Sequence, residues 1–520
     1  MRSLFFLIVI IIKISGLTAQ NFSKNYYILD DIDAGFKVFV VKEDYLIEYF
    51  ATKKIKMDDG NYYTRYIGYL RTDKNGDLIS KINHEGILGY SDLIDEKYIY
   101  CSGFEGWGLY KINNCKVLKT DNFGNTLKIN TILFKDGDHK ILDSKYFNSN
   151  IYASDMNQYS GDSFKDKIFT NDTFQIHKFD TSLVYQKTIV CPYIQPLSRR
   201  LSTVVHDDNF FVCAVSIQDT SQKYKGNLKY SAIAFDSLGK QKWVYHTTPF
   251  NGLFQKEYIS SFGNKDKSTT FMIPYIPSFG GWPLQQIVKL NDKGKKLWSY
   301  DDLFNNINDT YEFVSIFKTK NDDVVAVGVF YNGSVDSVPD RRSGIIMRIS
   351  NDGKLKWKRR VWDDRAAFHH SGFNNGVELE DGGLLITGWW RDSLGEPNYD
   401  TNVWLIKLDS MGCYTPGCTG DDFVTSTDNV IVIGRDMLKL SPNPANQFIK
   451  CTWSGLPSTA KLIKLYDLNG RELMQSKIEG KSGSTELNIS SLIQGMYLVK
   501  IYGDKWESAP EKFVKSSITN

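Results

Sequence analysis

Hydrophobic and polar residues alternate in short runs along most of the chain, a pattern that indicates strands with two unlike faces. One turn recurs between these runs. It follows an apolar strand and consists of Asp or Asn, two further residues and Gly, and the strand after it often carries Trp. Seven copies lie about 56 residues apart, and their glycine place is held by Gly76, Gly124, Leu183, Gly239, Gly294, Gly353 and Gly412.

Each repeat holds more than this one hairpin. Around Gly353, the runs VSIFKT, VVAVGVF, GIIMRIS and KLKWKRRV predict four strands in two hairpins. Four-stranded units of this length are typical of propeller blades, which bury their faces against one another in a ring. The sequence therefore predicts an all-β chain with a seven-bladed β-propeller over residues 20–418. Trp243, Trp298 and Trp357 hold one place in three successive units, which favours packing between blades.

Closure of the ring needs a strand from the other end of the chain. The last unit ends soon after Gly412, where the run CYTPGC interrupts its outer strand. The run NYYILD at Asn25–Asp30 is strand-like and precedes the first unit. We therefore expect this N-terminal segment to complete the last blade.

Residues 438–520 have a different pattern. Their motif residues are Pro442, Asn443, Pro444, Asn469, Gly470, Gly495 and Tyr497. The two prolines favour extended backbone, and the Asn-Gly pair between two apolar runs predicts a hairpin. The last two motif residues belong to an alternating strand. These signals predict a small Ig-like antiparallel β-sandwich, joined to the propeller by a linker over residues 419–437.

The order of these motifs, followed by Lys515, closely resembles the C-terminal sorting domain of the type IX secretion system of Bacteroidetes. The resemblance implies a cargo protein that the type IX machinery recognises and delivers to the cell surface or the medium. The propeller repeats are similar to those of quinoprotein-type secreted propellers. The cofactor-facing residues of such enzymes have no identifiable counterparts in this sequence, so no cofactor is predicted.

The N-terminus has the three parts of a signal peptide. Arg2 precedes the apolar run Leu4–Ile12, and small residues end at Ala19. We expect cleavage there, so that residues 1–19 are a signal peptide and the export route passes through the periplasm. The apolar run is shorter than the roughly 20 residues that span a bilayer. No other segment predicts a transmembrane helix in the mature chain.

Seven cysteines are compatible with export, because disulfides form in oxidising compartments. Cys413 and Cys418 flank the turn signal Pro-Gly, and we expect them to form a disulfide. Cys101 and Cys115 could pair across a hairpin or remain buried thiols. The pairing of the other cysteines stays open.

Composition limits the partners. The net charge is +3, and removal of Arg2 and Lys13 with the signal peptide leaves 61 basic and 60 acidic residues. This balance gives no electrostatic support for binding to nucleic acid or to an anionic membrane surface. The sequence has no CxxC pair, HExxH, P-loop or Gly-x-Ser-x-Gly motif, so it predicts no metal site and no common catalytic centre.

Long loops at one end of the predicted blades would form a ligand face, and polar residues are densest in the last two blades. The candidates are Asp363, Asp364, Arg365, His369, His370, Trp390 and Arg391. Carboxylates and imidazoles suit a cation or acid–base chemistry, and an exposed Trp suits a sugar ring. The alternative is a solvated loop with ordinary surface charges. The loop tryptophans Trp107, Trp282 and Trp390 would then pack at the loop bases.

These observations favour a non-catalytic binding or scaffold module carried by a secretion cargo. The alternative is a propeller-based hydrolase or lyase that acts on extracellular polysaccharide or peptide. The enzyme hypothesis requires the candidate residues to converge on one site.

Overall fold

The protein was analysed as a computed structural model that describes most of residues 21–516. Outside the description are residues 1–20, 28–31, 43, 58–59, 86–87, 96–97, 105–113, 122–124, 134–138, 158–173, 192–195, 208–209, 219–227, 248–258, 276–283, 302–308, 333–340, 364–369, 392–400, 419–421, 425–430, 434–436, 457–459, 468–470, 504–505, 509 and 517–520. The predicted signal peptide lies among them. The described residues form strands and contain no α-helix, which confirms the all-β prediction.

Within the described residues, strands β1–β28 form seven sheets, which we number as blades 1 to 7 in chain order. Blades 1 to 3 contain β2 (Ile32–Val41), β3 (Asp44–Met57), β4 (Gly60–Thr72), β5 (Leu78–Glu85), β6 (Leu88–Asp95), β7 (Tyr98–Phe104), β8 (Asn114–Asp121), β9 (Thr126–Leu133), β10 (His139–Phe147), β11 (Asn150–Asn157), β12 (Phe174–Asp180) and β13 (Tyr185–Cys191). Blades 4 to 6 contain β14 (Pro196–Asp207), β15 (Phe210–Gln218), β16 (Leu228–Phe235), β17 (Gln241–His246), β18 (Ser260–Gly263), β19 (Thr269–Tyr275), β20 (Leu284–Leu290), β21 (Lys296–Asp301), β22 (Asp309–Lys318), β23 (Val324–Asn332), β24 (Arg341–Ile349) and β25 (Leu355–Asp363). Blade 7 contains β26 (Ser371–Glu378), β27 (Leu384–Arg391), β28 (Thr401–Leu408) and β1 (Phe22–Tyr27).

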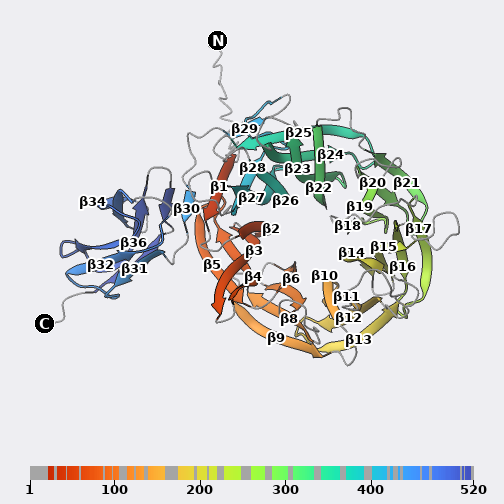
Figure 1. The fold of residues 1–520 in the computed structure, drawn as a ribbon, viewed down its shortest axis with the longest axis horizontal. Coiled ribbons are helices and arrows are strands. Elements are labelled where there is room, and N and C mark those ends of the chain that lie inside the picture. Colours follow the sequence, from red (N-terminus) through yellow and green to blue (C-terminus); the bar gives the residue numbers. More distant parts are fainter. Residues whose placement is uncertain are drawn as a thin grey trace, which may run out of the picture.

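Figure 1 shows the blades arranged as a ring, with the first strand of each blade innermost. The inner strands contact one another in ring order, from β6 through β10, β14, β18, β22 and β26 to β2. Polar side chains join them as well. The hydroxyls of Ser202 on β14 and Ser261 on β18 lie 2.8 Å apart, and the Asn374 amide donates to the Gly35 carbonyl at 2.8 Å. Because neighbouring strands are antiparallel, the second and fourth strands of every blade end on the same side of the ring.

The repeated turn joins the third and fourth strands of a blade. In blade 4, the Asp236 carboxylate accepts the backbone N–H groups of Leu238 and Lys240, both at 2.9 Å. The glycine of this turn, Gly239, has a φ of +78°. In blade 3 the same place is held by Leu183, whose φ is +59°. The repeat therefore imposes left-handed backbone even where the residue is not glycine.

The tryptophan after the turn packs on the turn of the next blade. A Cβ added to Gly353 would lie 2.8 Å from the ring of Trp298. The Trp298 indole also donates to the carbonyl of Asn351 in that turn at 2.9 Å. Trp243 contacts Gly294 in the same way. Packing of these tryptophans between blades is therefore confirmed.

The ring is closed by β1, which is the fourth strand of blade 7. Tyr26 of β1 pairs with Val403 of β28 in antiparallel register. The Tyr26 hydroxyl donates to the carbonyl of Gly76, in the turn of blade 1, at 2.6 Å. The N-terminal segment thus completes the last blade, as the sequence predicts.

The C-terminal domain lies beside the ring and has two layers of strands (Figure 1). Its strands are β31 (Leu438–Ser441), β32 (Phe448–Trp453), β33 (Leu462–Tyr466), β34 (Glu472–Lys477), β35 (Gly483–Asn488), β36 (Gly495–Tyr502), β37 (Trp506–Ser508) and β38 (Glu511–Lys515). β33 and β34 form the hairpin expected around Asn469-Gly470, although that turn lies outside the described residues. Tyr497 is buried on β36 whereas Met496 is 43% exposed, which confirms the predicted alternation.

The proline motif and the last strand of this domain lie side by side. The Asn443 side-chain amide donates to the Lys512 carbonyl and its oxygen accepts the Val514 N–H, both at 3.0 Å. Lys515 is only 6% exposed, and its Nζ lies 3.5 Å from the amide oxygen of Asn446. The motif residues at the two ends of the domain sequence therefore meet in space.

Two short strands occur in the predicted linker. β29 (Asp422–Val424) pairs in parallel with β25, and β30 (Ile431–Ile433) pairs in parallel with β1 and β37. Through β30, the sheet of blade 7 continues into a sheet of the C-terminal domain. The connection is thus partly strand, which the weak periodicity of this segment does not predict.

The structure contains the predicted disulfide between Cys413 and Cys418, with their Cα atoms 5.7 Å apart. The alternative pairing across the β7–β8 hairpin does not fit the register. Cys101 lies opposite Leu118, which is three residues beyond Cys115. The buried free thiols among the described residues are Cys191, Cys213 and Cys451.

Candidate ligand face

The predicted candidates belong to strand ends at one side of blades 6 and 7. Because the strands are antiparallel, the ends of β23, β25 and β27 and the starts of β24 and β26 lie on this same side. We call the facing surfaces of these two blades the seam, and this side its upper end. The described residues there are separated along the chain by the undescribed segments 333–340, 364–369 and 392–400.

His370 and Arg391 meet at the upper end of the seam. The Arg391 Nη1 lies 3.0 Å from the His370 Nδ1, and the Arg391 backbone N–H donates to the His370 carbonyl at 3.0 Å. A guanidinium can only donate, so the His370 Nδ1 accepts. The ring is then neutral, and its hydrogen is on Nε2. His370 therefore presents an N–H donor beside a positive charge.

Arg342 adds a second guanidinium to this place. Its backbone forms an isolated parallel β-bridge with the backbone of His370, and its Cζ lies 5.2 Å from the centroid of the Tyr331 ring. The Tyr331 hydroxyl donates to the Glu312 carboxylate at 3.1 Å. We call Arg342, His370 and Arg391 the basic cluster. All three side chains are partly exposed.

The structure describes the other predicted residues only in part. Asp363 is the last residue of β25, at the upper end of the seam, and only its backbone is described. Asp364, Arg365 and His369 lie outside the described residues. The structure therefore brings together His370 and Arg391 of the candidate set. Arg342 was missed because it follows a loop of another blade, although its run Arg-Arg-Ser-Gly marks a basic strand start.

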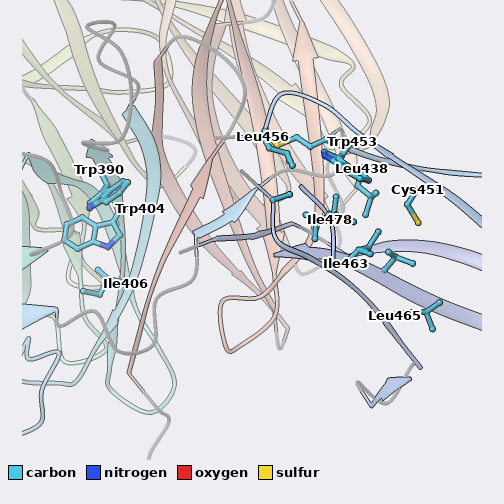
Figure 2. Close-up of a cluster of buried hydrophobic side chains, with 14 of the residues drawn as sticks. Trp390, Trp404, Ile406, Leu438, Cys451, Trp453, Leu456, Ile463, Leu465 and Ile478 are labelled. Carbon is cyan, nitrogen blue, oxygen red and sulfur yellow. The ribbon is translucent and has the colours of Figure 1, made fainter. Parts of the chain in front are cut away.

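The expectation of an exposed loop position for Trp390 is wrong. Trp390 lies in β27, is 1% exposed, and is opposite Ser371 and Asn402 in the sheet register. It therefore belongs to the interior of the seam, where Figure 2 shows it beside Trp404. The ring of Trp404 stacks on Phe373 at 4.8 Å. Trp107 and Trp282 lie outside the described residues.

A set of buried polar side chains lies across blade 7, on the face that carries Trp390 and Trp404. It consists of Asn25 on β1, Ser371 on β26 and Asn402 on β28, and we call it the buried polar set. These residues share one face of the blade with Trp390 and Trp404, because their positions alternate in register. The amide atoms of Asn25 and Asn402 and the Ser371 hydroxyl have no hydrogen-bond partner among the described residues.

Charged groups also gather at the lower end of the seam, where their role is structural. The Arg348 Nε lies 2.9 Å from the Asp323 carboxylate, and its Nη2 lies 3.4 Å from the Glu378 carboxylate. Lys356 contacts the same Asp323 oxygen at 2.7 Å. Each charge thus has an opposite charge beside it, as buried ions require.

The part of the chain that the structure describes shows no group of three or more His, Cys, Asp or Glu side chains that could hold a metal ion. Among the same residues, no helix has the length and apolar character needed to cross a membrane.

Comparison with known proteins identifies the C-terminal part. Residues 439–516 match the family model of the secretion system C-terminal sorting domain. The C-terminal domain is a type IX secretion sorting domain. The sorting domain marks the chain as an exported cargo protein, secreted or on the cell surface, that the type IX machinery handles. Since the match covers this domain alone, it assigns no activity to the propeller.

No curated protein is significantly similar to the chain. Among solved structures, the Pyrococcus horikoshii acylaminoacyl peptidase is 12% identical, with a TM-score of 0.42, over 72% of this chain and 52% of the peptidase. The chain thus spans about half the length of that enzyme. The β-propeller domain of the Trilobed protease from Pyrococcus furiosus is 13% identical, with a TM-score of 0.40, over 71% of this chain and 94% of that domain. The polysaccharide lyase Uly1 is 8% identical, with a TM-score of 0.40, over 72% of this chain and 90% of the lyase. Similarities at this level carry no functional argument.

Proposed function

We propose that the propeller is a non-catalytic binding module that an exported cargo protein presents outside the cell, and that it binds an anionic ligand at the upper end of the seam. In this proposal, residues 1–19 are a signal peptide for passage through the periplasm. Residues 20–418 form the binding propeller, residues 419–437 the linker and residues 438–520 the sorting domain.

The observation that carries the proposal is the contact between the side chains of His370 and Arg391, with the backbone of Arg342 bridged to that of the same histidine. Two guanidiniums and an imidazole N–H provide donors from three different strand ends. Such donors form charge-assisted hydrogen bonds to a carboxylate, sulfate or phosphate, each worth about 1.5–3 kcal/mol. The basic cluster consists of two arginines and a histidine, and the nearby Glu312 carboxylate accepts the Tyr331 hydroxyl. A binding function therefore fits better than a hydrolase or lyase.

The test is binding of the mature full-length chain to polygalacturonate, dextran sulfate, oligoglutamate and neutral dextran. We expect binding to at least one anionic probe and none to neutral dextran. Arg391→Ala should weaken anion binding about tenfold or more, since the loss of one charge-assisted bond exceeds about 1.4 kcal/mol. Arg471→Ala is the matched control, because Arg471 is an exposed arginine of the sorting domain. Equal binding by the Arg391→Ala variant and the wild type would overturn the proposal.

A further inference from the structure

We propose that the sorting domain docks on the type IX machinery through one outward sheet face, on which Met496, Leu498 and Val514 form an apolar patch. The family match shows that the machinery handles this domain, but it assigns no surface to the contact. The proposal concerns delivery of the protein, and it is independent of any ligand of the propeller.

The apolar patch results from the alternation of residues along β36 and β38. On the inner side of these strands, Tyr497 and Phe513 are 5% and 0% exposed and belong to the core of the domain. The residues between them in sequence therefore face outward. Met496 is 43% exposed and pairs directly with Val514, which is 40% exposed, and the partly exposed Leu498 continues the same outward row. A single exposed apolar residue is ordinary, but a contiguous group of them marks an interaction surface.

The other outward sheet face of the domain is polar. On β32 and β35, Lys450 lies opposite Glu486 and Thr452 lies opposite Ser484, and all four residues are exposed. Phe448, at the start of β32, is 49% exposed, and the next residue along its outward row is Lys450. The two faces therefore differ in chemistry, and an apolar partner surface matches the face formed by β36 and β38.

The backbone edge beside the apolar patch is already covered. The Ala445 N–H donates to the Val514 carbonyl at 2.9 Å, and the Ser516 N–H donates to the Ala445 carbonyl at 2.8 Å. The side chain of Asn443 bonds to the backbone of Lys512 and Val514 along the same edge. A partner therefore cannot add a strand to this part of β38 and must contact the side chains of the sheet face.

The patch is also remote from the junction with the propeller. β30 pairs with β37, and β37 pairs with β36 at Tyr502. Met496 lies six residues from Tyr502 on the same strand, which corresponds to about 20 Å. The junction therefore leaves this end of β36 accessible, in agreement with the exposure of Met496 and Val514.

The side chains of this face define the chemistry of the partner. Burial of the apolar patch supplies the driving force, and the flexible thioether of Met496 adapts to an irregular partner surface. Lys512 is exposed on the same outward face, opposite Leu498. A charge at the rim of an interface sets the orientation of the partner more than it adds affinity. The complementary surface of the machinery is therefore apolar and carries a carboxylate at its rim.

The test is delivery of full-length variants by cells with an active type IX system, measured as the ratio of external to cell-retained protein. Met496→Glu and Val514→Glu should each lower this ratio about tenfold or more, because docking must then desolvate a carboxylate. Met496→Leu should be delivered like the wild type, because it keeps the patch apolar. Phe448→Glu is the matched control, because Phe448 is similarly exposed on the polar face, and it should also be delivered normally. Thermal unfolding of the purified variants should match that of the wild type, since all the substituted residues are exposed.

Wild-type delivery of both Met496→Glu and Val514→Glu would overturn the proposal. An equal loss of delivery in Phe448→Glu would overturn it as well, because the effect would then not belong to one face. If the two glutamate variants unfold at a lower temperature than the wild type, Met496→Gln and Val514→Thr replace them with polar side chains of similar size. Wild-type delivery of these two variants would then contradict the proposal.

A second copy of the chain is the alternative occupant of the patch. Analytical ultracentrifugation of the full-length wild type and of Met496→Glu distinguishes the two occupants. A wild-type dimer that Met496→Glu dissociates without any loss of delivery would show that the patch joins two copies, and the proposal would be wrong. None of these outcomes depends on anion binding by the propeller, so their failure leaves the proposed function unaffected.

Discussion

The repeated turn requires glycine at position 353 for two separate reasons, the backbone conformation and the space beside the backbone. The φ of Gly353, +87°, lies in the left-handed region, and the Trp298 ring occupies the space where a Cβ would be. Gly382, in another turn of the propeller, has a similar φ of +82°, but the nearest atom to its added Cβ is 3.9 Å away, on Ser410. Substitution of Gly382 therefore tests the left-handed backbone alone, whereas substitution of Gly353 tests the backbone and the contact with Trp298 together.

We predict that Gly353→Ala destabilises the protein more than Gly382→Ala does. Left-handed backbone should cost each variant about 1–2 kcal/mol. In Gly353→Ala, displacement of Trp298 should add about 1–3 kcal/mol, the usual cost of overpacking. The measurement is urea unfolding of the full-length chain, with Gly382→Ala as the control. Equal losses would show that the Trp298 contact has no energetic weight.

His206 gives a second prediction for a single residue. Burial lowers its pKa from 6.5 to about 4, against the opposing charge of Asp207. Its Nε2 lies 2.7 Å from the Thr269 hydroxyl, and its ring stacks on Phe210 at 4.9 Å. Lys267 and Lys318 disfavour the charged form further, whereas Asp207 and Asp266 favour it. The folded state therefore holds a neutral imidazole at a pH where the unfolded chain binds a proton.

The sign of the pH dependence follows from these pKa values. Above pH 6.5 both states are neutral at this residue, and the stabilisation from His206 is fully present. It should be lost as the pH falls from 6.5 toward 4. We expect His206→Gln to have a smaller decrease of the unfolding free energy over this range than the wild type. Identical pH profiles of the two proteins would contradict the assignment.

In blades 3 to 5, one place on the fourth strand contacts the repeated turn of the next blade. Trp243 and Trp298 donate from this place to a carbonyl of the next turn, at 2.8 and 2.9 Å. In blade 3 the same place is held by Lys187, which donates to the Ser237 carbonyl at 3.4 Å. At blade 7 the neighbouring turn is reached by β1 instead, through Tyr26. In blades 3 to 5 the place is held by a side chain that donates to the next turn, and both Trp and Lys can do so.

We predict that Tyr26→Phe weakens the closure of the ring. The variant keeps the ring of the side chain but leaves the Gly76 carbonyl without its buried donor, which should cost about 1–3 kcal/mol. The measurement is chemical unfolding of the full-length chain, followed by propeller tryptophan fluorescence. Tyr466→Phe is the matched control, because its hydroxyl bonds to Tyr502 within the sorting domain. A propeller transition that shifts equally in both variants would contradict the prediction.

The features that the sequence predicts well are strands with strong periodicity and contacts across a short local turn. The repeated hairpins, the closing segment and the bond between Cys413 and Cys418 depend on short-range signals. The structure contains the hairpins and the bond, and the closing strand is described as β1, Phe22–Tyr27, which covers the first part of the predicted Asn25–Asp30. β29 and β30 are three residues each and pair with distant strands, so no local pattern indicates them. The conformation of such short strands is determined by the strands of the folded protein with which they pair.

The candidate site was predicted only in part, for a reason that belongs to the whole molecule. His370 and Arg391 stand near each other in the sequence of one blade, and their loops indicated a common face. Arg342 comes from a different blade. Its position beside His370 depends on how the two blades pack, which periodicity does not specify. The burial of Trp390 has the same origin, because its face is covered only when blade 6 is present.

Deletion of Leu438–Asn520 tests whether the sorting domain directs secretion while the propeller binds the ligand. We predict that the truncated protein accumulates in the periplasm, because the sorting domain is the part that the secretion machinery recognises. The measurement is fractionation of the producing cells, with the full-length chain as the control. Ligand binding by the truncated propeller should persist, since β1–β28 and the basic cluster precede the deletion. Normal surface delivery of the truncated protein would contradict the prediction.

The closing strand has a consequence for the order of folding. The indole of Trp404 donates to the hydroxyl of Ser23, and these residues are 381 positions apart in the sequence. Blades 1 to 6 consist of hairpins between nearby residues, which form fast, whereas contacts between distant residues form late. Blade 7 must therefore wait until both ends of the propeller sequence are free in one compartment. Because Ser23 enters the molecule with that last strand, the interior face of blade 7 is complete only once the ring has closed.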